Sequence, residues 1–282
     1  MLSNHFIGVL FALASAFVWG SGDFSGGLAT RRSNQFQVLA LSTFAGVVVL
    51  VVLALWRGEA LPSPMSAWWA GSAGLAGALG IAGLYRALAM GQAANVAPTA
   101  AVVSVALPVL YGAISEGWPG TQRLVGFTLA VAGIWLVSKA TGESDRTARQ
   151  AVVLALLSGV GFGGFFILIA RVEAGLVFTP LIVARGASLG VALVLLLANR
   201  VPLPGLAGSP IAILAGVLDT GGNVLYLVAK QYMRVDDAAV LASLYPVSTV
   251  LLAGLLLKQK VSGVQWLGAG LCMVAVVLIS LP

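Results

Sequence analysis

The sequence contains little charge. Only 9% of its 282 residues are Asp, Glu, Lys or Arg, whereas 60% are hydrophobic. Soluble domains are about one quarter charged, and a chain of this length has no way to bury so much apolar surface in a single water-facing core. The composition therefore excludes an ordinary soluble domain and predicts that lipid covers part of the surface.

Cysteine and histidine are nearly absent. The only cysteine, Cys272, lies in the last apolar run, where we expect it to be buried, and the only histidine, His5, precedes the first run. These counts exclude a disulfide framework or a Cys/His zinc site within the chain, and no cofactor is predicted. The fifteen Lys and Arg residues are scattered singly, which does not suit a nucleic-acid partner.

Long apolar runs take up most of the chain. A helix needs about twenty apolar residues to cross the hydrocarbon core of a bilayer. Ten runs meet this length approximately: 6–30, 36–56, 67–90, 94–115, 121–138, 150–170, 177–198, 209–231, 237–257 and 262–281. The start "MLSNHF" lacks the basic residues of a signal peptide, so we expect a retained first span. The predicted fold class is an all-α integral membrane protein with ten transmembrane helices.

The two halves of the sequence resemble each other. "ALASAFVWGSGDF" (12–24) aligns with "ALLSGVGFGGFFI" (155–167), and "LVGFTLAVAGIWLVS" (124–138) with "WLGAGLCMVAVVLIS" (266–280), at an offset close to 142. A constant offset indicates an internal duplication. We therefore expect a first repeat over 1–140, a polar linker over 141–149 and a second repeat over 150–282. Five spans in each half insert the two repeats in opposite directions, a design typical of transporters.

Glycine and proline add two local expectations. Glycine recurs at every third position from Gly71 to Gly83, which predicts a smooth stripe for close helix packing. Pro108 and Pro246 lie at related places in the fourth and ninth runs, and each removes a backbone hydrogen bond, so bends are expected there.

Three segments carry a resemblance to a known family. "VWGSGDFSGG" in the first run, 95–119, and "LASLYPVSTVLLAGLLLKQKVSGVQWLGAGL" (241–271) resemble the EamA-type members of the drug/metabolite transporter superfamily. The resemblance covers essentially the whole chain. It implies two inverted five-helix repeats in a bacterial plasma membrane and movement of small metabolites, often outward. One departure is that a Gly-Glu pair usually ends the fourth helix of each half, whereas this chain has Ser115-Glu116 and Lys258-Gln259, so no role is carried to Gln259.

A few charged and polar residues interrupt the apolar runs. Asp219, Asn223 and Tyr226 share one helical face, and so do Ser15, Trp19 and Asp23. We expect these faces to meet in a polar cavity halfway through the bilayer. The predicted substrate-binding residues are Trp19, Asp23, Tyr85, Arg185, Asp219, Asn223 and Tyr226.

Each of these side chains has chemistry that suits a small polar substrate. Arg185 can bind a carboxylate through two hydrogen bonds, and Trp19 and Tyr226 can hold a side chain or an ammonium group. Asp23 or Asp219 could carry a coupling proton. The simpler interpretation is a structural ion pair between Arg185 and one of the two aspartates. Arg86, Lys230 and Glu116 lie near run ends, where they are expected to extend to the membrane interface.

The alternative function is that of an enzyme. "GSGD" (20–23) fits the GxGD motif of intramembrane aspartyl proteases, and "DTG" (219–221) resembles an aspartic protease triplet, so Asp23 and Asp219 could activate a water. The Tyr-Asp pair and the Pro-Ala-Leu segment of those proteases are missing, and their halves are not duplicates. We therefore predict that the chain is not an enzyme but a secondary transporter. Amino acid export is the candidate activity, and protons are the candidate coupling ion.

The orientation in the membrane has two conflicting indications. The odd-numbered connections carry eight Lys and Arg residues and the even-numbered ones four, which places both termini outside. The family resemblance implies that both termini lie inside, and we follow it because the charge bias is small.

Overall fold

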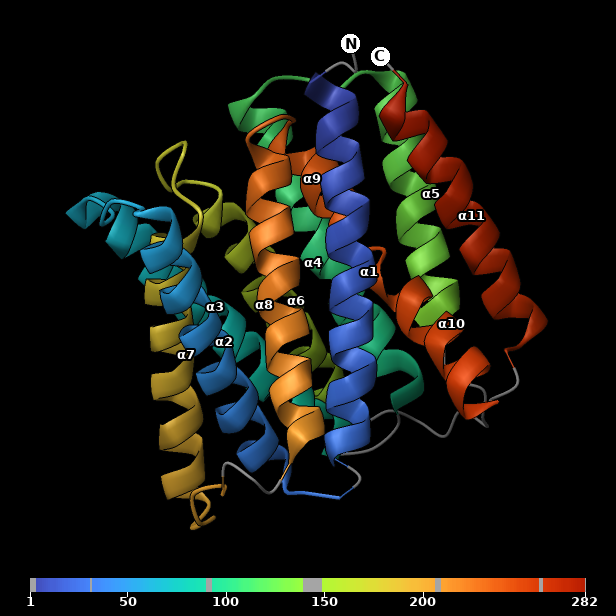
Figure 1. Cartoon of the computed structure of the whole chain (residues 1–282). Helices are drawn as coiled ribbons and strands as arrows, with labels where there is room; N and C mark the ends of the chain where they lie inside the picture. Colours follow the sequence, from blue (N-terminus) through green and yellow to red (C-terminus); the bar gives the residue numbers. More distant parts are fainter. Residues whose placement is uncertain are drawn as a thin grey trace.

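The chain forms a bundle of helices that run between two ends (Figure 1). A computed structural model describes residues 4–30, 32–89, 93–138, 149–205, 209–258 and 261–281, leaving aside the side chains of residues 85, 88, 89, 93–98 and 138. In this part of the chain all regular secondary structure is helical. Both termini lie at the upper end in Figure 1, together with the connections after α2, α4, α6 and α8.

Each half contributes its helices in the expected order. The first half forms α1 (Asn4–Thr30), α2 (Gln35–Arg57), α3 (Pro64–Ala89), α4 (Ala93–Ser115) and α5 (Thr121–Ser138). The second half forms α6 (Arg149–Ile169), α7 (Phe178–Ala198), α8 (Pro210–Lys230), α9 (Val235–Ala242), α10 (Tyr245–Leu257) and α11 (Gly263–Ser280). Among the described residues, eight segments are long and apolar enough to cross a membrane, and Thr99–Ser115 and Thr121–Val137 are shorter apolar helices. The all-helical membrane class predicted from the composition agrees with this architecture.

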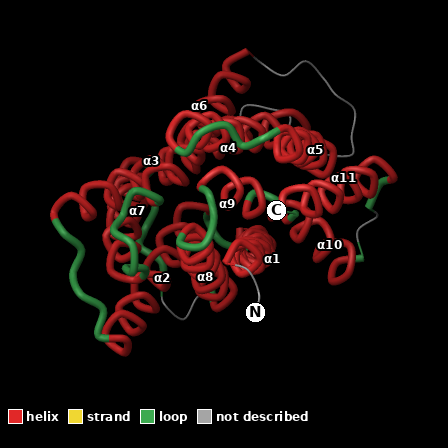
Figure 2. Tube along the Cα trace, turned by 90° about the horizontal axis from the view of Figure 1, so that it is seen from above, coloured by secondary structure: helices red, strands yellow, loops and turns green. Residues whose placement is uncertain are grey.

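The ninth run is divided into two helices, whereas one was expected over 237–257. α9 ends at Ala242 and α10 begins at Tyr245, with Pro246 in its first turn. Proline lacks an N–H and is accepted in the first turn of a helix but not in its interior, so a new helix starts here. Pro108, in contrast, lies within an unbroken α4. All eight residues of α9 are buried, and Figure 2 shows this short helix in the middle of the bundle.

The glycine stripe of α3 lets its backbone approach two neighbouring helices. A Cβ atom at Gly74 would lie 2.0 Å from the Ala184 carbonyl oxygen of α7. A Cβ atom at Gly80 would lie 3.0 Å from the Phe162 ring of α6. The close packing predicted from the glycine spacing is therefore found, against α6 and α7.

Helix contacts between the halves come in matching pairs. α1 packs mainly on α8, and α3 packs mainly on α6. α6 takes the place of α1 in the second half, and α8 takes the place of α3, so these two contacts are equivalent. Two more equivalent pairs follow. The contact of α4 with α6 corresponds to that of α9 and α10 with α1, and the contact of α2 with α8 corresponds to that of α7 with α3. The remaining large contacts, α2 with α7 and α5 with α11, join each helix to its own counterpart. The largest contacts between the halves thus recur when the halves are exchanged, whereas smaller ones, such as α4 with α5, have no such match.

Candidate functional site

The candidate site lies where α1, α7 and α8 meet. Glycines allow α1 and α8 to approach closely at this point: a Cβ atom at Gly222 would lie 2.4 Å from Cδ1 of Trp19, and one at Gly22 would lie 3.1 Å from the Asp219 nitrogen. Small residues at such crossings bring polar side chains of one helix within reach of the backbone of the next. The local sequence therefore places Trp19 and Asp219 against each other.

Arg185 and Asp219 form an ion pair between α7 and α8 through Nη2 and Oδ2. Both residues lie well inside their helices rather than at the ends. The two partners differ in exposure, because the Arg185 side chain is 13% exposed and the Asp219 side chain 43%. The structural pair that the sequence suggested is thus present, and its carboxylate is the more accessible partner.

The main-chain carbonyl oxygen of Asp219 accepts two side-chain hydrogen bonds. The Trp19 indole Nε1 donates from 3.0 Å, and the Asn223 Nδ2 donates from 2.6 Å. One turn earlier on α1, the Ser15 hydroxyl donates to the Gly222 carbonyl oxygen over 2.7 Å. The predicted polar faces of α1 and α8 therefore do meet, but through side-chain-to-backbone bonds.

Tyr226 lies in an aromatic cluster together with Trp19 and Phe166. The ring of Tyr226 stacks on Trp19 with centroids 6.1 Å apart and meets Phe166 edge-on at 4.9 Å. Its side chain is fully buried, and its hydroxyl donates to the Phe166 carbonyl oxygen over 3.1 Å. In this conformation Tyr226 packs the junction of α1, α6 and α8.

Asp23 lies one turn beyond Trp19 on α1 and is exposed. Its carboxylate is within electrostatic range of Asp219. Among the described residues, no hydrogen bond or ion pair reaches it. The side chain of Tyr85, the remaining predicted residue, lies outside the described part of the chain. The structure thus links Trp19, Arg185, Asp219, Asn223 and Tyr226 in one network and leaves Asp23 beside it.

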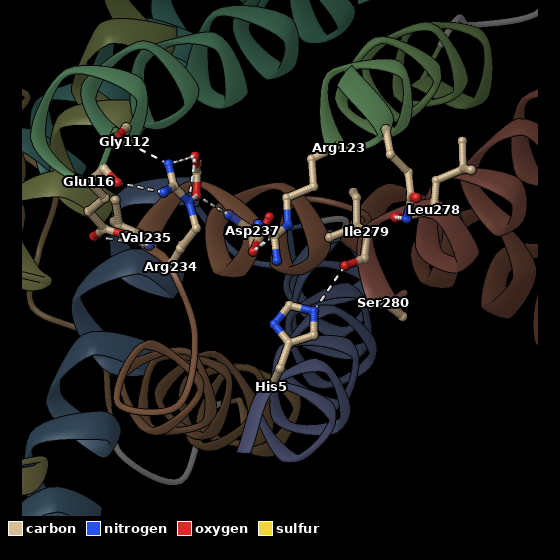
Figure 3. A network of polar contacts seen from close by, with 12 residues as sticks. His5, Gly112, Glu116, Arg123, Arg234, Val235, Asp237, Leu278, Ile279 and Ser280 are labelled. Atoms are coloured by element: carbon tan, nitrogen blue, oxygen red, sulfur yellow. Dashed lines mark hydrogen bonds and ion pairs between the residues drawn. The ribbon is translucent and has the colours of Figure 1, made fainter. Parts of the chain in front are cut away.

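A second polar network occupies the upper end of the bundle (Figure 3). It joins the end of α4 and the start of α5 to α8 and α9, and we call it the upper-end cluster. Its members are Glu116, Arg123, Lys230, Arg234, Asp236 and Asp237. Sequence reasoning missed Asp236 and Asp237, although two adjacent aspartates at the start of an apolar run were a visible signal. Lys230 and Glu116, expected to reach the interface separately, pair with each other at 3.5 Å.

Comparisons with known proteins agree on one family. The model of the EamA-like transporter family matches residues 6–139 and again residues 149–281. The "Uncharacterized inner membrane transporter YedA" of Escherichia coli strain K12, and its namesake of strain O157:H7, are 26% identical to this chain, over 97% of it and 90% of the relative. A solved crystal structure shares the fold, with a TM-score of 0.75 at 20% identity over 96% of this chain and 95% of the other.

Proposed function

Since the chain belongs to the EamA-like transporter family, we propose that it is a secondary active transporter of a small polar metabolite. The family match confirms the resemblance noted in the sequence, and it implies transport of small solutes across a membrane. We place the protein in the bacterial inner membrane as a multi-pass protein, because the relative YedA is called an inner membrane transporter and the chain has many apolar spans.

In this proposal the chain crosses the membrane ten times as two inverted repeats. Two observations support it: the family model matches each half separately, and the largest helix contacts between the halves recur when the halves are exchanged. An odd number of crossings in the first repeat makes the second enter from the opposite face. The repeats would then rock against each other, so that a site between them opens to each side in turn.

The main evidence for the substrate site is the ion pair between Arg185 and Asp219, which lies in the interior of two apolar helices. A charge facing hydrocarbon is costly, so ionisable residues in membrane helices normally face a water-filled space or another charge. The 43% exposure of the Asp219 side chain and the exposure of Asp23 support a water-accessible space beside the pair. We propose that the substrate enters there.

The chemistry of this site suits an amino acid. Arg185 can exchange Asp219 for a substrate carboxylate, because a guanidinium binds a carboxylate with two parallel hydrogen bonds. The carboxylate released from the pair, together with Asp23, can then attract the substrate ammonium group. Trp19, Asn223 and Tyr226, with Tyr85 from the other half, would line the walls. Asp23 or Asp219 would bind the coupling proton.

The protease alternative has less support. An aspartyl protease needs two carboxylates that share a proton and activate a water. Here the Asp219 carboxylate forms an ion pair with Arg185, and no hydrogen bond among the described residues links it to Asp23. The family match to transporters in both halves also favours transport.

The test is a ligand screen followed by flux. Purified protein is heated with each amino acid in turn, because a ligand of the native state raises the melting temperature. Each ligand found is then measured by counterflow in proteoliposomes. We expect Arg185→Lys to lose both the thermal shift and the flux, because an ammonium lacks the planar fork of arginine. Arg171→Lys, at an exposed arginine of the upper end, is the matched control. Wild-type protein without counterflow of any amino acid would contradict this substrate class.

A further inference from the structure

The upper-end cluster connects the two halves of the chain. The Arg234 guanidinium donates to the carbonyl oxygens of Glu116 at 2.8 Å and Gly117 at 2.7 Å, which follow α4 in the first half. The Glu116 carboxylate in turn pairs with Lys230. On the other side, Arg123 Nε of α5 lies 3.4 Å from Asp237 Oδ2 of α9. Every one of these contacts crosses from the first half to the second, so the cluster holds the upper end together.

Asp236 is a fully satisfied member of this cluster. Its carboxylate accepts from Arg234 Nε at 3.0 Å and Nη2 at 2.8 Å, and from the Asp237 N–H at 2.9 Å. Gly112 of α4 makes room for it, since a Cβ atom there would lie 2.7 Å from the Asp236 Cγ. Hydrogen bonds of this kind satisfy the acceptors of a buried carboxylate. Burial of Asp236 therefore needs no further explanation.

Asp237, the next residue, is buried equally deeply but is not satisfied. Its side chain is 0% exposed, and neither carboxylate oxygen has a hydrogen-bond partner among the described residues. Its one ion pair among the described residues is with Arg123, whose Nε also lacks a hydrogen bond there. A buried charge without hydrogen bonds is strongly unfavourable unless it is paired or neutralised. Asp237 thus has two acceptable states: ionised beside Arg123, or protonated without it.

The charge of the cluster distinguishes these two states. With Asp237 ionised, the three carboxylates of Glu116, Asp236 and Asp237 balance the three cations Arg123, Lys230 and Arg234. Protonation of Asp237 leaves one positive charge in excess and removes the attraction that draws Arg123 towards α9. The Arg123 side chain is 26% exposed, so it can turn to water once released.

We propose that Asp237 is a proton-binding site that controls contact between the halves: ionised, it pairs with Arg123 and closes the upper end; protonated, it releases Arg123 and permits opening. The inference rests on the alternating-access transport proposed above. It places a proton site in the upper-end cluster, away from the residues proposed to bind substrate.

Other titratable groups could in principle produce a similar response. The charged and histidine side chains at the upper end of the elements packed against α9 are His5 on α1, Glu116 after α4, Arg123 on α5, Arg171 after α6, Lys230 on α8, and Arg234 and Asp236 beside Asp237. Asp23 on α1 and Asp219 on α8 lie deeper in the bundle. Histidine is the side-chain type used most often as a pH switch, so His5 is the main alternative. Its ring Nε2 is bonded to the Ile279 carbonyl oxygen at 3.0 Å, as Figure 3 shows. The test must therefore separate Asp237 from His5.

The experiment measures the opening directly. Cys272, the only native cysteine, is replaced by Ala, and spin labels are attached to cysteines at Thr121 in the first half and Gln231 in the second, both exposed at the upper end. Pulsed electron spin resonance then gives the distance distribution in lipid nanodiscs between acid and neutral pH. We expect a longer-distance population that grows as the pH falls. In Asp237→Asn, which mimics the protonated state, that population should be present at every pH.

Three further variants decide the outcome. Arg123→Gln should also give the longer distance at every pH, and it serves as the second test if Asp237→Asn does not fold. Asp236→Asn is the matched control, because the Asp236 carboxylate is as deeply buried as that of Asp237 but is fully hydrogen-bonded. The pH response of the distance should persist in Asp236→Asn and in His5→Gln. A pH-independent distance in wild type, or a response lost in His5→Gln but kept in Asp237→Asn, overturns the proposal. The distances require no known substrate, so this result and a failure to find transport are separable.

Discussion

The indole nitrogen of Trp19 donates a hydrogen bond to the main-chain carbonyl oxygen of Asp219, 3.0 Å away on α8. The same tryptophan stacks on Tyr226, so one side chain of α1 holds both a polar and an aromatic contact with α8. The carboxylate of Asp219 is left free to pair with Arg185 on α7. Trp19 therefore helps to position the backbone that bears the ion pair. Its hydrogen bond and its ring packing can be removed one at a time by substitution.

Replacing Trp19 by Phe keeps an aromatic ring and removes the hydrogen bond. We expect a loss of about 1 kcal/mol in the free energy of unfolding, the usual net contribution of a hydrogen bond. Trp19→Ala also removes the ring packing against Phe166 and Tyr226 and should cost about 3–5 kcal/mol. Denaturation of the purified protein, followed by circular dichroism, measures both. Equal losses in the two variants would show that the ring packing contributes little.

The unequal exposure of Arg185 and Asp219 predicts unequal effects of removing either one. Asp219→Asn leaves an unpaired guanidinium that is only 13% exposed, whereas Arg185→Gln leaves a carboxylate that is 43% exposed and open to hydration. Loss of one partner of a buried pair costs about 3–5 kcal/mol. We therefore expect Asp219→Asn to approach that range and Arg185→Gln to fall below it.

The double variant Arg185→Gln/Asp219→Asn supplies the control for this prediction. It leaves no unpaired charge, so it should be more stable than Asp219→Asn alone. Unfolding midpoints of the three proteins in one detergent decide the question. If the two single variants lose equal stability, exposure is not the controlling factor.

Much of this architecture could be predicted because it depends on local sequence. Apolar runs mark the helices, and residues three, four or seven apart share a face, which is why Trp19 was placed with Asp23 and Asp219 with Asn223. What lies opposite a face is set by tertiary packing. Tyr226 is predicted to line the substrate site, and which side chains pack against its ring, here Trp19 and Phe166, could not be read from the sequence.

The upper-end cluster shows the limit of local reasoning more clearly. Acidic residues in the first turn of a helix usually face water, where they also interact well with the helix dipole. Asp236 is buried instead, because Arg234 bonds it and because Gly112, from the other half of the chain, makes room for it. Partners separated by more than a hundred residues leave no periodic signal in the sequence.

The glycine stripe of α3 predicts a graded response to alanine. At Gly74 the added Cβ atom would lie 2.0 Å from the Ala184 carbonyl oxygen, and backbone cannot move away cheaply. At Gly71 the nearest atom is a Val183 methyl carbon at 3.7 Å, an ordinary contact. We expect Gly74→Ala to lower the unfolding free energy by about 1–3 kcal/mol or more, as overpacking does, and Gly71→Ala to change it little. Because both sites lie on the same face of one helix, equal thermal stability in the two variants would contradict the packing described.

Asp23 provides the test of proton coupling at the substrate site. It is exposed on α1, within electrostatic range of Asp219, and no described residue bonds it. If it carries the coupling proton, Asp23→Asn should abolish flux driven by a pH gradient in proteoliposomes, because asparagine neither binds nor releases a proton in this range. Counterflow, which exchanges substrate without net proton movement, should continue. Glu173→Gln, at an exposed carboxylate of the upper end, is the control and should keep both activities. If Asp23→Asn still shows flux driven by the pH gradient, Asp23 is not the coupling residue and Asp219 becomes the candidate. The same measurement on Asp219→Asn then decides whether either carboxylate carries the proton.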